Sequence, residues 1–351
     1  MKSENYFLKR IDKLKAQLNH DEGLIIYNPI DLFYLTGLEL SHGFFVCDNQ
    51  KATLIVDHRY IQAAQEKSPI SVQLLTKEAI KIAISGVSFL KFDSSTTSYQ
   101  QYIDWKERFP HLTLIPINHP LAPLRLIKDL GEITNLKKSA DLLKKGYQHI
   151  LNHLKEGISE KELSSLFSSF VIAQGADGLA FDPIIAFGAN SAKPHHRAHE
   201  TRLQKGDLIL IDIGVKSAHY HSDMTRCHFF QTDEHPLMSW YEIIKEAQKA
   251  ALSFCKPGRV LKEVDMAARS VLKKHDLDSY FTHNLGHGVG LQIHEQPRLH
   301  FEGDYKEMVL EPGLVFTIEP GLYKEGLGGV RYEDTIVITE NGYDSFSGEV
   351  L

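Results

Sequence analysis

The sequence predicts an α+β protein in which a smaller α/β domain, residues 1–124, precedes a larger mixed domain, residues 125–351. Three observations predict this division. Short apolar strands alternate with helices throughout residues 1–124, which is the pattern of a small α/β unit. The segment HPLAPLR, residues 119–125, carries two prolines and is typical of a connection. Beyond it the pattern turns helical and then becomes a series of strands that contain acidic residues.

The first domain is expected to begin with a charged helix, in which Phe7, Ile11, Leu14 and Leu18 recur at helical spacing. Strands with turns between them are expected over residues 23–37, 43–48, 51–57, 87–93 and 112–117, and helices over 61–68 and 99–109. Glycine-rich phosphate loops of the Rossmann and Walker types are absent from the sequence, so no nucleotide site is predicted.

The second domain is expected to open with two helices. Ile133, Leu136 and Ala140 begin one apolar stripe that continues to residue 151. The next helix follows Ser159, whose spacing to Glu162 is that of a capping box. Strands are then expected over residues 181–192, 206–214, 220–230, 313–321 and 330–339, and helices over 237–254 and 261–275.

The composition excludes several classes of function. A net charge of −6 gives no electrostatic footprint for nucleic acid. No apolar run approaches the ~20 residues that span a bilayer, and the charged N-terminus lacks the apolar core of a signal peptide. The three cysteines are far apart and form no CxxC pair, which argues against a disulfide framework or a zinc–thiolate site. We therefore expect a cytoplasmic protein that binds neither nucleic acid nor membrane.

Two aspartates interrupt apolar strands. Asp212 follows the run Leu208–Ile211, where a carboxylate costs several kcal/mol unless something pairs it. The plainer interpretation is a turn residue at the end of a strand. Asp223 lies eleven residues further on, which fits two antiparallel strands joined by a short loop near residues 216–218. Adjacent carboxylates repel each other unless a cation lies between them.

Two glutamates repeat this pattern, Glu319 in GLVFTIEPG and Glu333 in VRYEDTIVIT. A shared pair of divalent ions explains all four acids together. Carboxylate oxygens suit manganese, magnesium or calcium, and an added imidazole shifts the preference toward manganese, cobalt or zinc.

The candidate imidazoles lie in FTHNLGHGVGLQIHE, residues 281–295. His283 and His287 are four residues apart, but Gly286, Gly288 and Gly290 argue against a helix and allow the backbone to approach a ligand closely. The glutamate of an HExxH zinc motif is missing. A second group, His195-His196, follows a proline and is by default an exposed loop. We interpret His199 and the histidines at 219 and 221 as surface residues.

With these residues in place, the chain resembles the pita-bread metallopeptidases. DIGVKSAHYHSDMTR, HNLGHGVGLQIHE, TIEPGLY and GGVRYEDT are similar to the branch that comprises Xaa-Pro aminopeptidases and Xaa-Pro dipeptidases, or prolidases. NPIDLFYLTGL and DHRY are similar to the N-terminal domain of that branch, so the resemblance covers the whole chain. The implied architecture is a pita-bread (creatinase/aminopeptidase) fold, residues 125–351, after a creatinase-like N-terminal domain, residues 1–124.

The resemblance also implies a ligand set for two divalent ions per chain, with manganese preferred and cobalt or zinc as alternatives. Asp212 and His287 would belong to different ions, and Glu319 would share the ion of His287. Asp223 and Glu333 would contact both ions. The resemblance further implies substrate-site roles for His195, His283 and His294, and a place beside the metal ligands for Arg331.

One local departure concerns His195. Lys-Pro-His-His replaces the usual apolar-Pro-His-Gly stretch, and we favour His195 over His196 because it follows Pro194.

The implied activity is cleavage of the bond between an N-terminal residue and a following proline by a metal-bridging hydroxide, with Glu319 as proton shuttle. We expect an Xaa-Pro aminopeptidase that acts on peptides with proline in the second position and forms a homodimer. An Xaa-Pro dipeptidase is the nearest alternative. A non-catalytic binding protein and a metal-free amidinohydrolase of the creatinase type are remoter, because no ligand of the set is missing. The sequence contains no GxSxG motif of a serine nucleophile.

Overall fold

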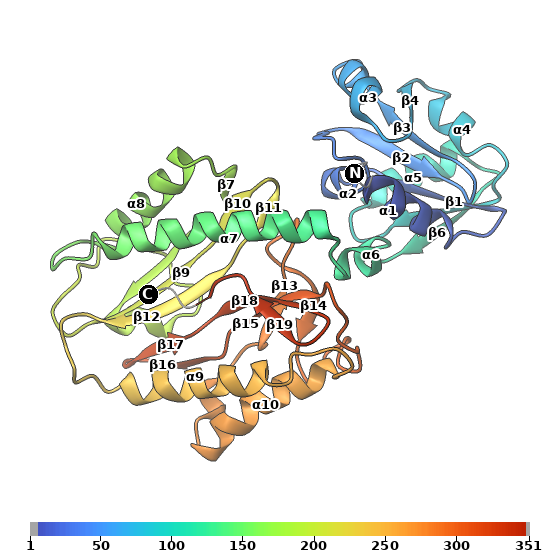
Figure 1. The fold of residues 1–351 in the computed structure, drawn as a ribbon. Helices are drawn as coiled ribbons and strands as arrows, with labels where there is room; N and C mark the ends of the chain where they lie inside the picture. The colour runs from blue at the N-terminus through green and yellow to red at the C-terminus, as the bar shows by residue number, and fades with distance from the viewer. Residues whose placement is uncertain (1–5, 349–351) are drawn as a thin grey trace. The chain divides into compact units, whose positions relative to one another are not determined.

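The computed structural model describes residues 6–348, and the chain divides into two compact units, Met1–Arg125 and Leu126–Leu351 (Figure 1). The first five residues of the charged N-terminal segment lie outside the described range. Among residues 6–348, no helix is long and apolar enough to cross a membrane.

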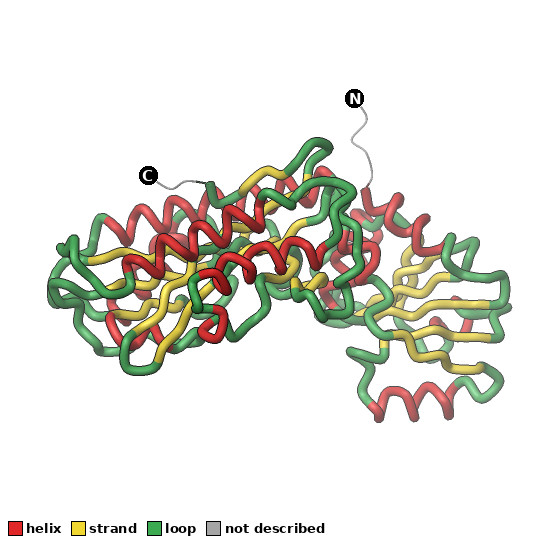
Figure 2. The backbone as a smooth tube through the Cα atoms, turned by 90° about the horizontal axis from the view of Figure 1, so that it is seen from below, coloured by secondary structure: helices red, strands yellow, loops and turns green. Residues whose placement is uncertain are grey.

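The first unit is built on a six-stranded sheet in the order β4-β3-β2-β1-β5-β6, whose strands run side by side in Figure 2. The strands are β1 Glu22–Ile26, β2 Gly43–Cys47, β3 Ala52–Val56, β4 Ser71–Leu74, β5 Phe89–Asp93 and β6 Thr113–Ile117. The helices are α1 Tyr6–Lys15, α2 Pro29–Thr36, α3 Ile61–Lys67, α4 Ala79–Ala83, α5 Tyr99–Arg108 and α6 Ala122–Leu126. Trp105 and Phe109 of the α5 region are buried in the core beside this sheet.

One expectation for the first unit is wrong, because Pro29–Thr36 forms helix α2 where a strand was predicted. The local reasons are visible in the residues at its ends. The side chain of Asn28 caps the backbone N–H of Ile30, and Pro29 occupies a first-turn position. Gly37 ends the helix in the left-handed conformation with φ of 71°. The predicted connection over 119–125 likewise contains most of the short helix α6.

In the second unit, strands lie between two pairs of helices (Figure 1). The helices are α7 Leu130–Leu151, α8 Glu160–Ala173, α9 Met238–Leu252 and α10 Leu261–Lys274. The strands and short 3₁₀ helices are β7 Gly178–Leu179, β8 Ile184–Phe187, η1 Gly188–Ala192, β9 Leu208–Ile213, β10 Val215–Ser217, β11 Tyr220–His221, β12 Met224–Phe229, η2 Asp278–Tyr280, β13 Gly286–Gly288, β14 Glu295–Leu299, β15 Val315–Ile318, β16 Gly321–Lys324, β17 Gly328–Arg331, β18 Asp334–Ile338 and β19 Tyr343–Ser345.

The sheets of this unit include one in the order β12-β9-β8 and one in the order β14-β13-β15-β18-β19. Alternate residues of β9 explain why the sheet is covered on both faces. Leu208 and Leu210 belong to the core that includes α9 and α10, whereas Ile209 and Ile211 belong to the core that includes α7 and α8. The strand predicted over 181–192 ends at Phe187, and residues 188–192 form the 3₁₀ helix η1.

Candidate metal centre and substrate site

Asp212 and Asp223 lie together, as the spacing predicted. Asp212 is inside β9 and pairs with Thr225 of the antiparallel β12, and Asp223 directly precedes β12. The strand assignment excludes the turn interpretation of Asp212. Both side chains are buried, and within residues 6–348 one oxygen of each, Oδ1, is buried without a hydrogen-bond partner. Such unpartnered buried carboxylate oxygens are typical of a cation-binding site.

The two glutamates meet at one end of a second strand pair. β15 and β18 are antiparallel with Ile318 opposite Asp334, so Glu319, just after β15, and Glu333, just before β18, lie at the same end. Glu333 is joined to the strand pair that carries the aspartates, because its backbone N–H donates to the Thr225 carbonyl at 3.2 Å. The Thr225 hydroxyl also donates to Glu333 Oε2 at 2.6 Å. All four acids therefore converge on one place.

His287 of β13 completes the cluster. Its Nε2 lies 3.6 Å from Asp223 Oδ2 and 3.5 Å from Glu319 Oε1. One ligand atom each from Asp223, His287 and Glu333 lie within 4.8 Å of one another. The other ring nitrogen, Nδ1, is 3.1 Å from the Gly288 carbonyl and must donate to it, which leaves Nε2 free to bind a metal.

Burial, together with repulsion among the acids of this cluster, raises their pKa values. Burial, followed by the charge of Glu333, raises the pKa of Asp223 and Glu319 well above the usual range for carboxyl groups. Burial and Asp212 raise the pKa of Glu333 to about 8, while burial lowers the pKa of His287 to about 3. A neutral imidazole among four crowded carboxylates fits divalent cations, because such ions remove the repulsion that burial amplifies. The residues present therefore suit a pair of metal ions.

A hydrogen-bonded network extends from the cluster through Arg331. Its guanidinium donates to Asp212 Oδ2, to the Thr225 hydroxyl at 3.0 Å and to the Tyr323 hydroxyl at 2.7 Å. Tyr323 in turn lies 3.1 Å from Nε2 of His283. We did not single out Tyr323 from the sequence. Strand alternation could have pointed to it. Gly321 of β16 pairs with Arg331 of β17, and Tyr323, two residues after Gly321, has its side chain on the same face of β16.

The histidines for which a substrate-site role was predicted differ in burial and in their contacts to this cluster. The ring of His294 packs edge-on against His287 with centroids 4.4 Å apart. Burial lowers the pKa of His283 to about 4 and also lowers that of His294, and the charge of His195 adds to both shifts. His195 is exposed, whereas His196 is buried and its Nε2 lies 2.8 Å from Glu160. Of the two neighbours, His195 is the one whose charge acts on His283 and His294, whereas His196 faces Glu160.

His221 is not the plain surface residue that we expected. Its side chain is partly buried, its Nδ1 donates to the Gly290 carbonyl at 3.1 Å, and its backbone N–H donates to the same oxygen at 2.9 Å. His221 thus fastens β11 to the glycine-rich segment between His287 and His294. A residue that acts only through such a long-range contact has no local signature in the sequence.

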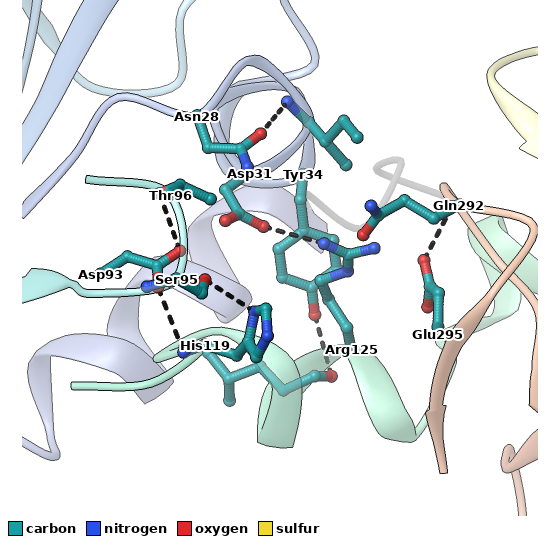
Figure 3. Close-up of polar contacts among 12 residues, drawn as sticks. Asn28, Asp31, Tyr34, Asp93, Ser95, Thr96, His119, Arg125, Gln292 and Glu295 are labelled. Atoms are coloured by element: carbon teal, nitrogen blue, oxygen red, sulfur yellow. Dashed lines mark hydrogen bonds and ion pairs between the residues drawn. The ribbon is translucent and has the colours of Figure 1, made fainter. Parts of the chain in front are cut away.

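The first unit contains a serine, a histidine and an aspartate in contact, but not in catalytic order (Figure 3). Ser95 Oγ donates to Asp93 at 2.5 Å and lies 2.9 Å from Nδ1 of His119. Asp93 receives the backbone N–H of His119 at 3.2 Å, whereas the His119 ring contacts Ser95. A triad needs the histidine between acid and serine. This group therefore organises a turn.

The fold is similar to that of known peptidases. A metallopeptidase family M24 model matches residues 134–340, and a creatinase/prolidase N-terminal domain model matches residues 10–127. An Xaa-Pro dipeptidase of Pyrococcus furiosus is 36% identical over 338 residues, which are 95% of this chain and 96% of that protein. An Xaa-Pro dipeptidase structure from Bacillus anthracis has a TM-score of 0.93 at 32% identity, covering 98% of each chain. An X-Pro aminopeptidase structure from Thermotoga maritima has a TM-score of 0.88 at 27% identity, covering 95% of this chain and 97% of its own.

These matches extend over both units and confirm the expected architecture, a creatinase-type N-terminal domain followed by a pita-bread domain. The chain belongs to metallopeptidase family M24, a family of hydrolases that use divalent metals.

Proposed function

We propose that this chain is an Xaa-Pro dipeptidase that uses a pair of divalent ions. The observation that carries the proposal is the cluster of four carboxylates, three of them buried and Glu319 partly buried, around the neutral imidazole of His287. We prefer a dipeptidase to the aminopeptidase that we expected from the sequence, because the named relatives from Pyrococcus furiosus and Pyrococcus horikoshii, both 36% identical, are Xaa-Pro dipeptidases.

In this proposal the metals are held by five side chains, which are Asp212, Asp223, His287, Glu319 and Glu333. Manganese is the ion that we propose, since oxygen ligands combined with one imidazole suit it well. When bound, such ions lower the pKa of water toward ~7 and polarise the substrate carbonyl. Arg331 donates to Asp212 Oδ2 and so fixes this carboxylate, while Asp212 Oδ1 stays available to a metal.

Glu319 is the residue that we assign to proton transfer. Its side chain is 16% exposed, whereas that of Asp223 is 6% exposed, so Glu319 is more open to the substrate side. The Thr317 hydroxyl lies 3.3 Å from Oε1 and holds that oxygen near His287, which leaves Oε2 to accept a proton. His195, His283 and His294 orient the substrate, because they lie around the cluster without belonging to the ligand set.

Dipeptide selectivity requires a cation for the free carboxylate next to the scissile bond, and we assign this role to Arg298. It pairs with His287 across β13 and β14, so the two side chains share one face of the sheet. Arg298 is exposed, and its charge adds to the burial that lowers the pKa of His287 and His294. Arg331 cannot take this role, since Asp212, Thr225 and Tyr323 already hold its guanidinium.

The test compares Ala-Pro, Ala-Pro-amide and Ala-Pro-Ala with manganese-loaded protein. Ala-Pro should be the best substrate, and the amide should be poor. Arg298→Gln should lower kcat/KM for Ala-Pro about 10- to 100-fold, because a charged hydrogen bond contributes about 1.5–3 kcal/mol. Arg259→Gln, which alters an arginine just before α10 that pairs with Glu263, is the control and should leave selectivity unchanged. If the wild type prefers Ala-Pro-Ala and Arg298→Gln does not alter this preference, the aminopeptidase is favoured.

We also propose that the protein is a cytoplasmic homodimer, as we expected from the sequence. Sedimentation velocity on the metal-loaded protein should give twice the chain mass of 39.8 kDa, and a species of one chain mass would contradict the dimer.

A further inference from the structure

We propose that Glu160 of α8 is a positioning residue that holds the loop of His195 in its working place. This inference rests on the proposed function and adds to it a residue outside the metal cluster. Glu160 is fully buried, at 0% exposure. Its carboxylate accepts four hydrogen bonds, from Phe187 N at 2.9 Å, Asn190 Nδ2 at 2.9 Å, His196 Nε2 at 2.8 Å and His199 N at 3.2 Å.

All four donors come from one segment, residues 187–199, and His195 lies inside it. Two donors bind Oε1 and two bind Oε2, so both oxygens of the carboxylate are occupied. Hydrogen bonds to an ionised acceptor are about twice as strong as neutral ones, and a carboxylate buried to this extent requires them. Because His196 is held toward Glu160, its neighbour His195 is left exposed, and the charge of His195 acts on His283 and His294.

The same segment is also fastened to the strand that carries Arg331. The Ser191 hydroxyl donates to the Gly188 carbonyl at 2.6 Å and accepts the backbone N–H of Gly329 at 2.9 Å. Gly329 has no space for a side chain, since a Cβ there would lie 2.5 Å from the Ser191 carbonyl oxygen. The loop is therefore tied to β17 at one end and to α8 along its length. Loss of the α8 ties would free the His195 end.

Glu160, His196 and His199 could also form a metal site, because one ligand atom from each lies within 4.8 Å of the others. Hydrogen bonding accounts for this group better. Nδ1 of His199 already lies 3.0 Å from the Thr201 hydroxyl, and each Glu160 oxygen already accepts two hydrogen bonds. The positioning role therefore requires no third ion, and metal stoichiometry can decide between the two interpretations.

The main test is Glu160→Gln in the manganese-loaded protein. Glutamine keeps the shape of the side chain, but its NH₂ group would face N–H donors of the loop in place of a carboxylate oxygen, so hydrogen bonds to the loop are lost. A displacement of about 1 Å can cost 10²-fold in turnover, so we expect kcat for Ala-Pro to fall about 10- to 100-fold. The variant should still bind the same number of manganese ions as the wild type. In a His195→Ala background, Glu160→Gln should cause no further loss, because residues that act through one another are not additive.

Hydrogen exchange provides a second measurement that needs neither metal nor substrate. In metal-free protein, hydrogen exchange at the amides of Phe187 and His199 should accelerate in Glu160→Gln, because both donate to the altered group. Glu162→Gln is the matched control. Glu162 lies on the same first turn but caps the backbone of Ser159, and it should leave kcat and these two amides unchanged.

Histidine variants keep the test decisive if Glu160→Gln does not fold. His196→Leu should reproduce the fall in kcat, and His196→Gln should recover most of it, since its amide can still donate to Glu160. The proposal is overturned by wild-type kcat in folded Glu160→Gln, by an equal further loss in the His195→Ala background, or by loss of a manganese ion. A wild-type protein that cleaves no Xaa-Pro dipeptide would instead refute the proposed function, while the exchange result would still test the contact.

Discussion

Replacing Arg226 by methionine tests how burial sets the strength of an ion pair near the metal centre. Arg226 of β12 lies 2.6 Å from Asp334 Oδ1, and the two side chains are 6% and 10% exposed. Its guanidinium also donates to the backbone carbonyls of Glu333 and Gly348. Methionine keeps the apolar stem but leaves a buried carboxylate without its cation. Such a loss costs about 3–5 kcal/mol, so we expect the free energy of unfolding to fall by that amount.

The matched control is Lys245→Met, which breaks the Lys245–Glu242 pair. Its distance is also 2.6 Å, but the side chains are 40% and 70% exposed. An exposed pair of this kind contributes about 0–1 kcal/mol, because water screens the charges in the folded state as well. Asp334→Asn combined with Arg226→Met should cost less than the sum of the single changes, since each variant removes the same interaction.

The assay is guanidinium unfolding of metal-free protein, followed by tryptophan fluorescence. The chain has two tryptophans, Trp105 in the first unit and Trp240 in α9 of the second. A Trp105→Phe background in every variant therefore makes Trp240 the reporter of the unit that contains Arg226. A cost for Arg226→Met no larger than that for Lys245→Met would refute the argument from burial.

Three further variants address the site itself. Glu319→Gln should lower turnover of Ala-Pro about 10²–10⁴-fold while at least one metal is retained, and near-normal turnover would move the proton-transfer role to another residue. Gly286→Ala would place a Cβ 1.9 Å from the backbone oxygen of Thr317, so it should lower the free energy of unfolding by about 3 kcal/mol or more and weaken metal binding at His287. Gly342→Ala, whose Cβ would have nothing within 4 Å, is the control and should leave the melting temperature unchanged. Tyr323→Phe should lower the stability by about 1–3 kcal/mol, because Arg331 loses a buried partner, and an unchanged melting temperature would contradict the network.

The convergence of the four acids was predictable because these acids conflict with their local surroundings. Asp212 interrupts a strand in which Leu210 and Ile211 face opposite cores. A strand that is buried on both faces has an uninterrupted apolar sequence, so the aspartate stands out in it. The glycines beside His287 also indicated a close approach of the backbone. A Cβ at Gly288 would lie 2.1 Å from the Gln296 carbonyl oxygen, so that close backbone approach demands glycine. These signals are local in sequence, and a pattern of a few residues contains them.

Other features depend on contacts that no local pattern contains. Glu160 looked like an ordinary residue in the first turn of a helix, yet its hydrogen-bond partners lie 27 to 39 positions further along the chain. Helix α2 was mistaken for a strand because its apolar residues, such as Leu32 and Leu35, are buried almost completely around the helix. The period that distinguishes helix from strand is then lost, and only the caps at Asn28 and Gly37 remain as evidence.

The central claim is that five side chains hold a pair of divalent ions, and metal counting tests it most directly. Protein stripped with a chelator, loaded with manganese and desalted should contain about two equivalents per chain. Asp223→Ala should reduce that content and remove the rise in melting temperature that manganese causes in the wild type, since a ligand that binds only the native state stabilises it. Manganese content near zero in the wild type, or content and melting temperature unaffected by Asp223→Ala, would contradict the account.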